Sequence, residues 1–195
     1  MPTESRDEVD PRITRTRSVV LAAVLSELAE AGYSGFRIES VAARAGVAKS
    51  TIYRHWPDRI GLILDALETL NVQPVTEANA SPCDEVANLL EHLARALTEG
   101  PLAACLPALI EGAQRDPRLR DLFHGYATRR RQALRDAVER GVRQGAFGAA
   151  VDPELAAQAL AGAIVYRRVM SADPFTTAEV PALLATVLGA DTSYP

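Results

Sequence analysis

Apolar residues recur along most of the chain at the spacing of amphipathic helices. From Thr14 onward they fall at positions i, i+3, i+4 and i+7, which predicts a first helix that Gly32 ends. Two short helices are expected over 38–45 and 49–56. Gly46 lies between them, where a left-handed residue closes a helix most easily.

The second short helix is expected to stop against Pro57, because the residue before a proline is disfavoured in the helical region. Asp58 can then cap a fourth helix, since its carboxylate can accept hydrogen bonds from the first free amides. This helix is expected to connect two domains. Its expected apolar face comprises Ile60, Ile63, Leu64, Leu67 and Leu70.

The second half of the chain is marked by helix-start signals. The polar segment 71–80 is interpreted as a linker. After it, a capping residue followed by proline occurs at 81–84, 116–117 and 152–154. Pro107 falls inside another helical stretch and predicts a kink or a break, because it removes an amide donor. No stretch has the period of a strand, so the sequence predicts an all-α fold.

Charge is distributed unevenly along the chain. The net charge is -4, yet residues 11–64 hold eight Lys and Arg against four Asp and Glu, a balance of +4. The remaining 13 basic and 21 acidic residues give -8. A locally basic module can neutralise phosphates although the whole chain is acidic, which favours a nucleic-acid partner for the N-terminal part.

Composition indicates a globular protein without a membrane span. Hydrophobic residues make up 48% of the chain, but no apolar run approaches the roughly 20 residues that cross a bilayer. The acidic N-terminus lacks the apolar stretch of a secretory signal, so a cytoplasmic protein is expected. Cys83, His92, Cys105 and His124 are scattered without metal-ligand spacing, and neither a metal nor another cofactor is expected.

The two short helices and their glycine-containing turn have the spacing of a helix-turn-helix. Val41, Ala42 and Ile52 can close a small apolar core between them. The opposite face of the second helix carries hydrogen-bond donors and an aromatic ring, so it can enter the major groove of DNA. The residues on this face are Lys49, Ser50, Thr51, Tyr53, Arg54 and His55.

The same segment closely resembles the tetracycline-repressor (TetR) family. The resemblance is carried by the string IESVAARAGVAKSTIYRHWP at residues 38–57, with Gly32 and Tyr33 before it and Arg59 after it. It covers about the first third of the chain. The resemblance implies a homodimeric repressor with a helical body, released from operator DNA by a small effector.

Position by position, the resemblance assigns roles on DNA. Lys49, Ser50 and Thr51 occupy the family's base-reading positions. Arg54 is a further candidate, because a guanidinium can bond both acceptors of guanine. The residues expected to contact phosphates are Tyr53, His55 and Arg59.

Two positions depart from the family's pattern, which usually has Ser or Thr there. Ala48 cannot cap the recognition helix with its side chain, and a phosphate contact is the expected role of Arg37 in place of a cap. Packing in the core is the alternative role for Tyr53 and the expected one for Trp56, since a large ring beside a proline more often packs than reads DNA.

The resemblance also places effector binding and dimerisation in the C-terminal helices. The expected walls of an effector pocket are formed by Leu93, Leu106, Leu109, Ile110, Phe123 and Tyr126. Because few charged residues lie among them, the effector is expected to be hydrophobic. Packing in the core is the alternative role for each of these residues. Small residues allow another helix to approach the helix over 152–171, either from a second copy or from within the chain. These small residues are Ala156, Ala159, Gly162 and Ala163.

Three regions are therefore expected: a disordered arm at 1–10, a DNA-binding domain at 11–72 and an effector-binding and dimerisation domain at 73–195. The arginines at 129–131 are interpreted as a solvated face or interface rim. No catalytic motif supports an enzyme. Two alternatives remain: an architectural DNA-binding protein without an effector, and a helical protein that binds a small molecule only.

Overall fold

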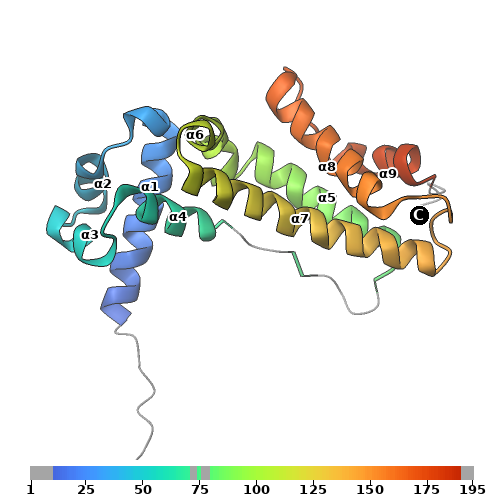
Figure 1. Cartoon of the computed structure of the whole chain (residues 1–195), viewed down its shortest axis with the longest axis horizontal. Coiled ribbons are helices and arrows are strands. Elements are labelled where there is room, and N and C mark those ends of the chain that lie inside the picture. Colours follow the sequence, from blue (N-terminus) through green and yellow to red (C-terminus); the bar gives the residue numbers. More distant parts are fainter. Residues whose placement is uncertain (1–10, 71–73, 76–79, 190–195) are drawn as a thin grey trace, which may run out of the picture.

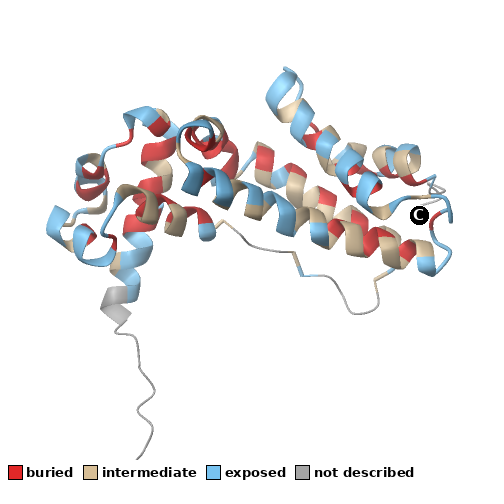
Figure 2. Ribbon diagram, in the orientation of Figure 1, coloured by how far each residue is buried: buried red, intermediate tan, exposed pale blue. Residues whose placement is uncertain are grey.

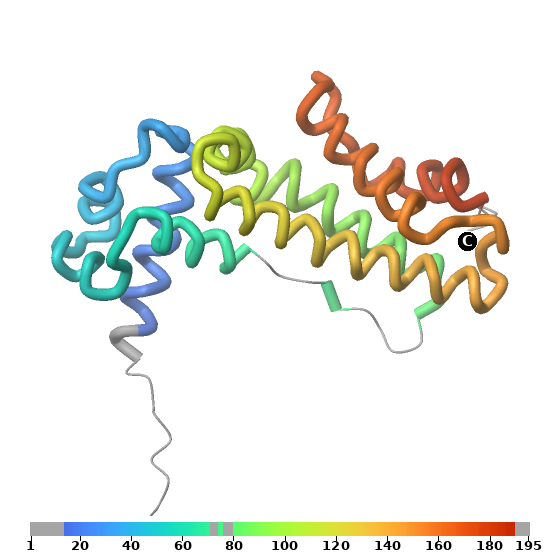
Figure 3. Tube along the Cα trace, viewed as in Figure 1, coloured from blue at the N-terminus to red at the C-terminus, as the bar shows by residue number. Residues whose placement is uncertain are grey.

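The computed structural model describes residues 11–70, 74–75 and 80–189, and within these ranges it contains helices and no strand (Figures 1 and 3). The expected all-α fold is confirmed, whereas the arm at 1–10 and most of the linker at 71–80 lie outside the described residues. The helices are α1 (Pro11–Gly35), α2 (Ile38–Ala45), α3 (Lys49–His55), α4 (Arg59–Glu68), α5 (Pro82–Thr98), α6 (Pro101–Arg115), α7 (Pro117–Arg143), α8 (Pro153–Met170), the 3-10 helix η1 (Thr177–Glu179) and α9 (Val180–Leu188).

Helices α1 to α4 gather at one end of the molecule, and α5 to α9 make up the rest (Figure 1). Helix α1 lies at the boundary and packs against α2, α4 and α6. Gly32 has φ 69° and interrupts its helical geometry, after which the chain resumes helical conformation as far as Gly35. The expected end at Gly32 is therefore a sharp kink near the end of α1.

Capping side chains fix the helix starts that the sequence predicts. The Asp58 carboxylate accepts a hydrogen bond from the Gly61 amide at 2.7 Å. Ser81 and Asp84 bond each other's backbone amides in a reciprocal capping box. A second such box, formed by Thr176 and Glu179, opens η1, and α9 then begins at Val180. Each cap satisfies amides that would otherwise lack partners.

Helix α6 runs from Pro101 to Arg115 without the break that Pro107 made possible. Pro107 has no backbone N–H group, so it cannot donate a hydrogen bond to the Ala103 carbonyl four residues earlier. In its place, Arg168 of α8 donates from Nη2 to the Ala103 carbonyl at 2.8 Å. The Arg168 Nε also donates to the Leu97 carbonyl in the last turn of α5, at 2.7 Å. One guanidinium thus satisfies two backbone acceptors and ties α8 to the corner between α5 and α6.

The two ends of the molecule are joined through a close contact between α1, α6 and α7. A Cβ at Gly112 would lie 2.3 Å from Leu119 Cδ2 and 2.7 Å from Tyr33 Cδ2, so only glycine allows the Tyr33 ring to pack there. Arg118 at the start of α7 donates to Asp58 at the start of α4, at 3.0 Å. Buried residues occur in all three helices (Figure 2).

No single helix in the described ranges is long and apolar enough to cross a membrane. Helices α5 and α6 reach that length and apolarity only when counted together, across a bend of 73°.

Candidate nucleic-acid interface and effector cavity

A tight turn holds α3 against α2. Gly46 adopts the left-handed conformation, with φ 67°, and the Val47 amide donates to the Ala42 carbonyl at 3.0 Å. Val41 of α2 and Ile52 of α3 are completely buried. Because these contacts use one side of α3, they leave its opposite side outside the core.

The outer side of α3 is exposed to solvent at the end of the molecule (Figure 1). Tyr53 has 49% of its surface accessible, and Thr51 is half-buried. Ala48 precedes the helix without a side-chain cap, and its carbonyl accepts from the Thr51 amide at 2.9 Å. The exposed polar and aromatic residues of this surface are Lys49, Ser50, Tyr53, Arg54 and His55.

Trp56 anchors the end of α3 in the core, as the sequence predicts, with 4% of its surface exposed. Its indole Nε1 donates to Asp65 Oδ2 of α4 at 2.7 Å. Arg17 of α1 forms an ion pair with the same carboxylate and lies over the indole ring, 5.5 Å from its centroid. These contacts position α3 through both α1 and α4.

Arg59, expected to contact a phosphate, is held within the chain by the end of α1 and by the turn after it. Its guanidinium donates to the Tyr33 carbonyl and lies 4.5 Å from the centroid of the Tyr33 ring and 5.3 Å from that of Phe36. A planar cation gains from stacking on aromatic faces. Arg59 therefore fastens the turn between α1 and α2 to α4.

The predicted base-reading residue Lys49 is paired with a carboxylate. Its Nζ donates to Glu39 Oε1 of α2 at 2.9 Å, and both side chains are exposed. The hydrogen bond from Lys49 lowers the pKa of Glu39, and the same bond raises the pKa of Lys49. Arg37, just before α2, is exposed and caps nothing with its side chain, which agrees with the expectation that it does not act as a cap.

Helices α5, α6, α7 and α8 enclose a cavity of about 130 Å³. Four of the six expected pocket residues line it: Leu93, Leu106, Phe123 and Tyr126. Most of the others are apolar, and two are arginines that were interpreted as surface residues. The remaining lining residues are Leu89, Leu90, Leu97, Leu102, Ala127, Arg130, Arg131, Leu134, Ala161 and Val165.

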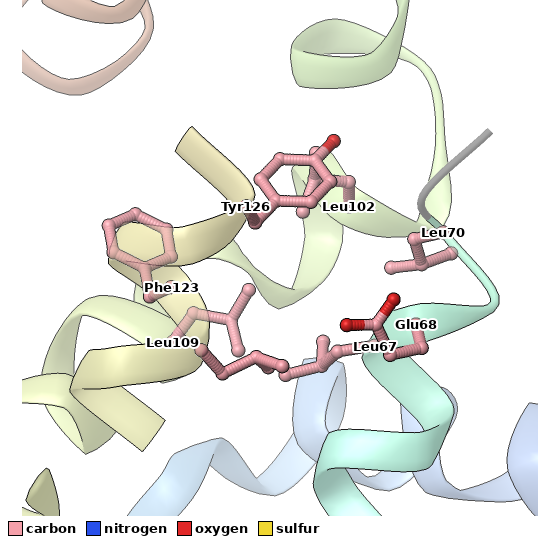
Figure 4. Close-up of a pocket in the computed structure, with 8 residues that line it drawn as sticks. Leu67, Glu68, Leu70, Leu102, Leu109, Phe123 and Tyr126 are labelled. Atoms are coloured by element: carbon pink, nitrogen blue, oxygen red, sulfur yellow. The ribbon is translucent and has the colours of Figure 1, made fainter. Parts of the chain in front are cut away.

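A smaller pocket of about 20 Å³ lies between α4, α6 and α7, and Figure 4 shows the side chains around it. Leu109 lines this pocket and not the larger cavity. Ile110, also expected in the pocket, lines neither of these two spaces, and its side chain packs partly buried against the core. Leu102, Phe123 and Tyr126 line both spaces.

Helix α8 carries a row of exposed apolar residues. Ala159 and Gly162 lie on this row, and Ala163 is half-buried. Ala156, also expected at a contact with a second copy, is buried in the core of its own chain. The large exposed residues of the row are Leu155, Val165, Tyr166, Val169 and Met170, and Figure 2 shows the far end of α8 as mostly exposed.

The other polar candidates have local partners. Arg129 pairs with Glu68 at 3.3 Å and Arg131 with Glu154 at 2.9 Å. The described residues hold no cluster of three or more His, Cys, Asp or Glu side chains suited to a metal. Burial raises the pKa of the Cys105 thiol to about 11, and its Sγ lies 3.2 Å from the Leu25 carbonyl, so it is a core residue.

A helix-turn-helix with an exposed second helix, carried on a larger helical body, defines a DNA-binding regulator. The family model described as bacterial regulatory proteins, tetR family, matches residues 20–66, and that described as Tetracyclin repressor-like, C-terminal domain, matches residues 81–187. The chain belongs to the TetR family of transcriptional regulators.

Individual relatives agree with this assignment. YdeS, an HTH-type transcriptional regulator of Bacillus subtilis, is 31% identical over 169 residues, which cover 84% of this chain and 83% of the relative. A TetR transcription regulator from Haloarcula marismortui has the same fold, with a TM-score of 0.71 and 18% identity over 89% of this chain and 95% of the other. AibR in complex with isovaleryl coenzyme A and operator DNA gives a TM-score of 0.66 and 16% identity, over 90% and 99% of the two chains.

Proposed function

We propose that the protein is a transcriptional repressor that binds a palindromic operator as a homodimer and leaves it when a small, largely hydrophobic molecule occupies the cavity. The exposed polar face of α3 carries this proposal, because its rigid attachment through Ile52 and Trp56 leaves the remaining side chains available to DNA. A recognition helix in this position reads base edges in the major groove.

The contacts to DNA follow from the direction of each side chain. The side chains that contact base edges are Lys49, Ser50, Thr51 and Arg54, and those that contact phosphates are Tyr53, His55 and Arg37. Arg54 is the strongest base-reading candidate, because its side chain is exposed and makes no ion pair within the described residues.

The apolar row on α8 supports a dimer of this chain. Tyr166 and Met170 are 64% and 70% exposed, although large apolar side chains are otherwise mostly buried in this protein. A twofold arrangement places the same row from both copies in contact. It also presents two recognition helices to half-sites about 34–36 Å apart, which makes the operator a palindrome.

The cavity supports effector control of the spacing between the recognition helices. Its walls include α6 and α7, which contact the DNA-binding helices at Gly112, Tyr33 and the Arg118 to Asp58 ion pair. A ligand that binds one arrangement of these helices better than another shifts the population toward it. AibR offers a precedent for a related fold that accommodates an acyl-CoA and operator DNA in one complex.

Two rival functions are disfavoured by particular features. An architectural DNA-binding protein has no use for a cavity of about 130 Å³ among otherwise packed helices. A protein that binds only a small molecule has no use for the exposed row of donors on α3. Regulation as an activator depends on where the operator lies relative to the promoter and uses the same contacts.

The experiment is selection of bound fragments from the source genome, followed by binding measurements on the enriched sequence and on random DNA. We expect Arg54→Ala to cost about 1–3 kcal/mol on the operator, or roughly 5- to 150-fold in Kd, and much less on random DNA. Arg129→Ala is the matched control, because Arg129 is an exposed arginine that pairs with Glu68 away from α3. Equal losses on both DNAs, or no enriched palindrome, would contradict the proposal.

A further inference from the structure

The effector cavity and the smaller pocket adjoin each other along α6 and α7. Leu102, Phe123 and Tyr126 line both spaces. The lining residues of α7 run from Leu122 in the pocket to Leu134 in the cavity, which is about 18 Å of helix at roughly 1.5 Å per residue. The two spaces therefore form an elongated site, with α4 at one end and α8 at the other.

The volumes of the two spaces suit a slender molecule. A cavity of about 150 Å³ in another protein holds benzene, so the cavity of about 130 Å³ suits roughly six to ten non-hydrogen atoms. The pocket of about 20 Å³ holds little more than one water-sized group. Leu67, Leu70 and Leu109 are among its walls (Figure 4). The end of an unbranched chain fits this pocket, whereas a ring or a branched end is too wide.

Two of the charged residues around the site form ion pairs within the chain. Glu68 lines the pocket and pairs with Arg129 at 3.3 Å. Arg131 lines the cavity and pairs with Glu154 at 2.9 Å. A charged ligand at either place would have to displace one of these partners, and it would lose its own hydration on burial.

The other two polar side chains of the cavity, Tyr126 and Arg130, interact with each other. The Arg130 guanidinium carbon lies 4.9 Å from the centroid of the Tyr126 ring, and Nη2 lies 3.3 Å from His92 Nε2. Burial raises the pKa of Tyr126, while the charge of Arg130 and a hydrogen bond from it offset part of that rise. Because both side chains are already engaged, a hydroxyl group can join them without the cost of burying another ion.

We propose that the effector is an uncharged, unbranched aliphatic molecule of about seven to ten non-hydrogen atoms, such as a medium-chain alcohol. This ligand class rests on the proposed function, because it describes the molecule that the effector cavity takes. The polar end of the molecule lies beside Arg130, its chain passes Phe123, and its terminal methyl group enters the pocket beside Leu67.

Contact with α4 connects the chain end to the recognition helix. Asp65 of α4 accepts a hydrogen bond at 2.7 Å from the indole of Trp56, the residue at which α3 ends. A chain that reaches Leu67 therefore contacts the helix that holds α3, whereas a shorter chain fills only the cavity. Short members of a series should bind without releasing DNA.

Five compounds test the ligand class: n-hexanol, n-octanol, its branched isomer 6-methylheptan-1-ol, octanoate and octylammonium. We expect n-octanol at 100 times its Kd to raise the Tm of the full chain by roughly 5–10 °C. It should bind about tenfold more tightly than n-hexanol, because two more methylene groups are buried. It should also bind at least about fivefold more tightly than the branched isomer and either ion. Equal or tighter binding of the isomer or of an ion, or binding of none of the five, would overturn the proposal.

Variants locate the chain within the site. Leu70→Trp fills the small pocket, so it should reduce the affinity for n-octanol to about that for n-hexanol and leave n-hexanol binding unchanged. Leu64→Trp is the matched control, because Leu64 is another partly buried leucine and lines neither space. Ala161→Leu fills the cavity itself and should weaken both alcohols. If Leu70→Trp keeps the preference for n-octanol, the proposal is wrong.

Operator binding distinguishes this inference from the proposed function. At equal occupancy, n-octanol should release operator DNA and n-hexanol should not, and equal release by both would overturn the contact of the chain end with α4. Release by an ion alone would leave the repressor function standing and overturn the ligand class. Binding of n-octanol as expected, without any change in operator affinity, would support the ligand class and count against effector-controlled repression.

Discussion

The two ends of the molecule differ in where their functional groups lie. In the DNA-binding end, Ile52 and Trp56 point inward and fill the core, while Tyr53, Arg54 and His55 lie on the outside. In the C-terminal end the polar groups of interest, Tyr126 and Arg130, face an internal cavity, and the outer surface of α8 is apolar. One end therefore presents its polar side chains on an exterior surface, and the other places them around an interior space.

This difference explains why the two sites call for different variants. A side chain on the outer face of α3 can be changed without disturbing the packing that holds the helix. The cavity residues also belong to the hydrophobic core, so their replacement alters stability together with binding. The two ends meet where Tyr33 of α1 packs on Gly112 of α6 and where Arg118 of α7 pairs with Asp58.

The largest effect is expected from Tyr166→Asp on the apolar row of α8. A charge on a face that packs against its own copy should prevent dimerisation. Because two linked recognition helices bind a palindrome far more tightly than one, operator affinity should fall by about 100-fold or more. Sedimentation and titration of operator DNA would measure both changes.

Thr128→Asp serves as the control for this variant, since it places the same charge on an exposed residue of α7. It should leave a dimer with unchanged operator affinity. A Tyr166→Asp protein that remains dimeric would show that the α8 row is not the interface and would weaken the contrast between the two ends.

An intermediate effect is expected from Arg168→Met. This change removes the donors from the Leu97 and Ala103 carbonyls, and one of these carbonyls already lacks its helical partner because of Pro107. Losing them should destabilise the C-terminal end by about 2–3 kcal/mol and lower the Tm by roughly 4–12 °C. Calorimetry would measure the shift, and Arg143→Met, which breaks only an exposed pair with Glu139, should change the Tm little. A Tm equal to that of the wild type would contradict the structural role of Arg168.

The sequence predicted the caps and the recognition helix because short-range chemistry determines them. Asp58, Ser81 and Gly46 act within a few residues of their own positions. A polar face on a short helix after a turn such as that at Gly46 indicates a helix that contacts DNA. The contacts of Arg59 were not predicted, because the rings that hold it come from the end of α1 and from the turn after it, which are distant in the sequence. Family register alone does not indicate that packing.

The cavity was predicted only in part, since an apolar stripe is the same whether it fills a core or lines a space. Arg130 carried an unused signal: it follows Phe123 and Tyr126 at helical spacing and precedes Leu134, so it lies on the apolar stripe of α7. The fully buried Leu62 of α4 was not predicted either. Helix α4 buries a wider face than the spacing of its apolar residues predicted.

The smallest effect is expected from Glu39→Gln on the DNA-binding end. Glu39 holds Lys49 at 2.9 Å and places a negative charge near the surface proposed to face DNA. Removing that charge should release Lys49 to neutralise a phosphate, so affinity for random DNA should rise about two- to fivefold and the dependence of log K on log salt should steepen by about 0.9. Glu30→Gln, which breaks an exposed pair with Arg44, should leave both quantities nearly unchanged. Because the affinity for random DNA would rise more than that for the operator, specificity should fall. An unchanged salt dependence would mean that Lys49 does not approach the phosphates even when its carboxylate partner is gone.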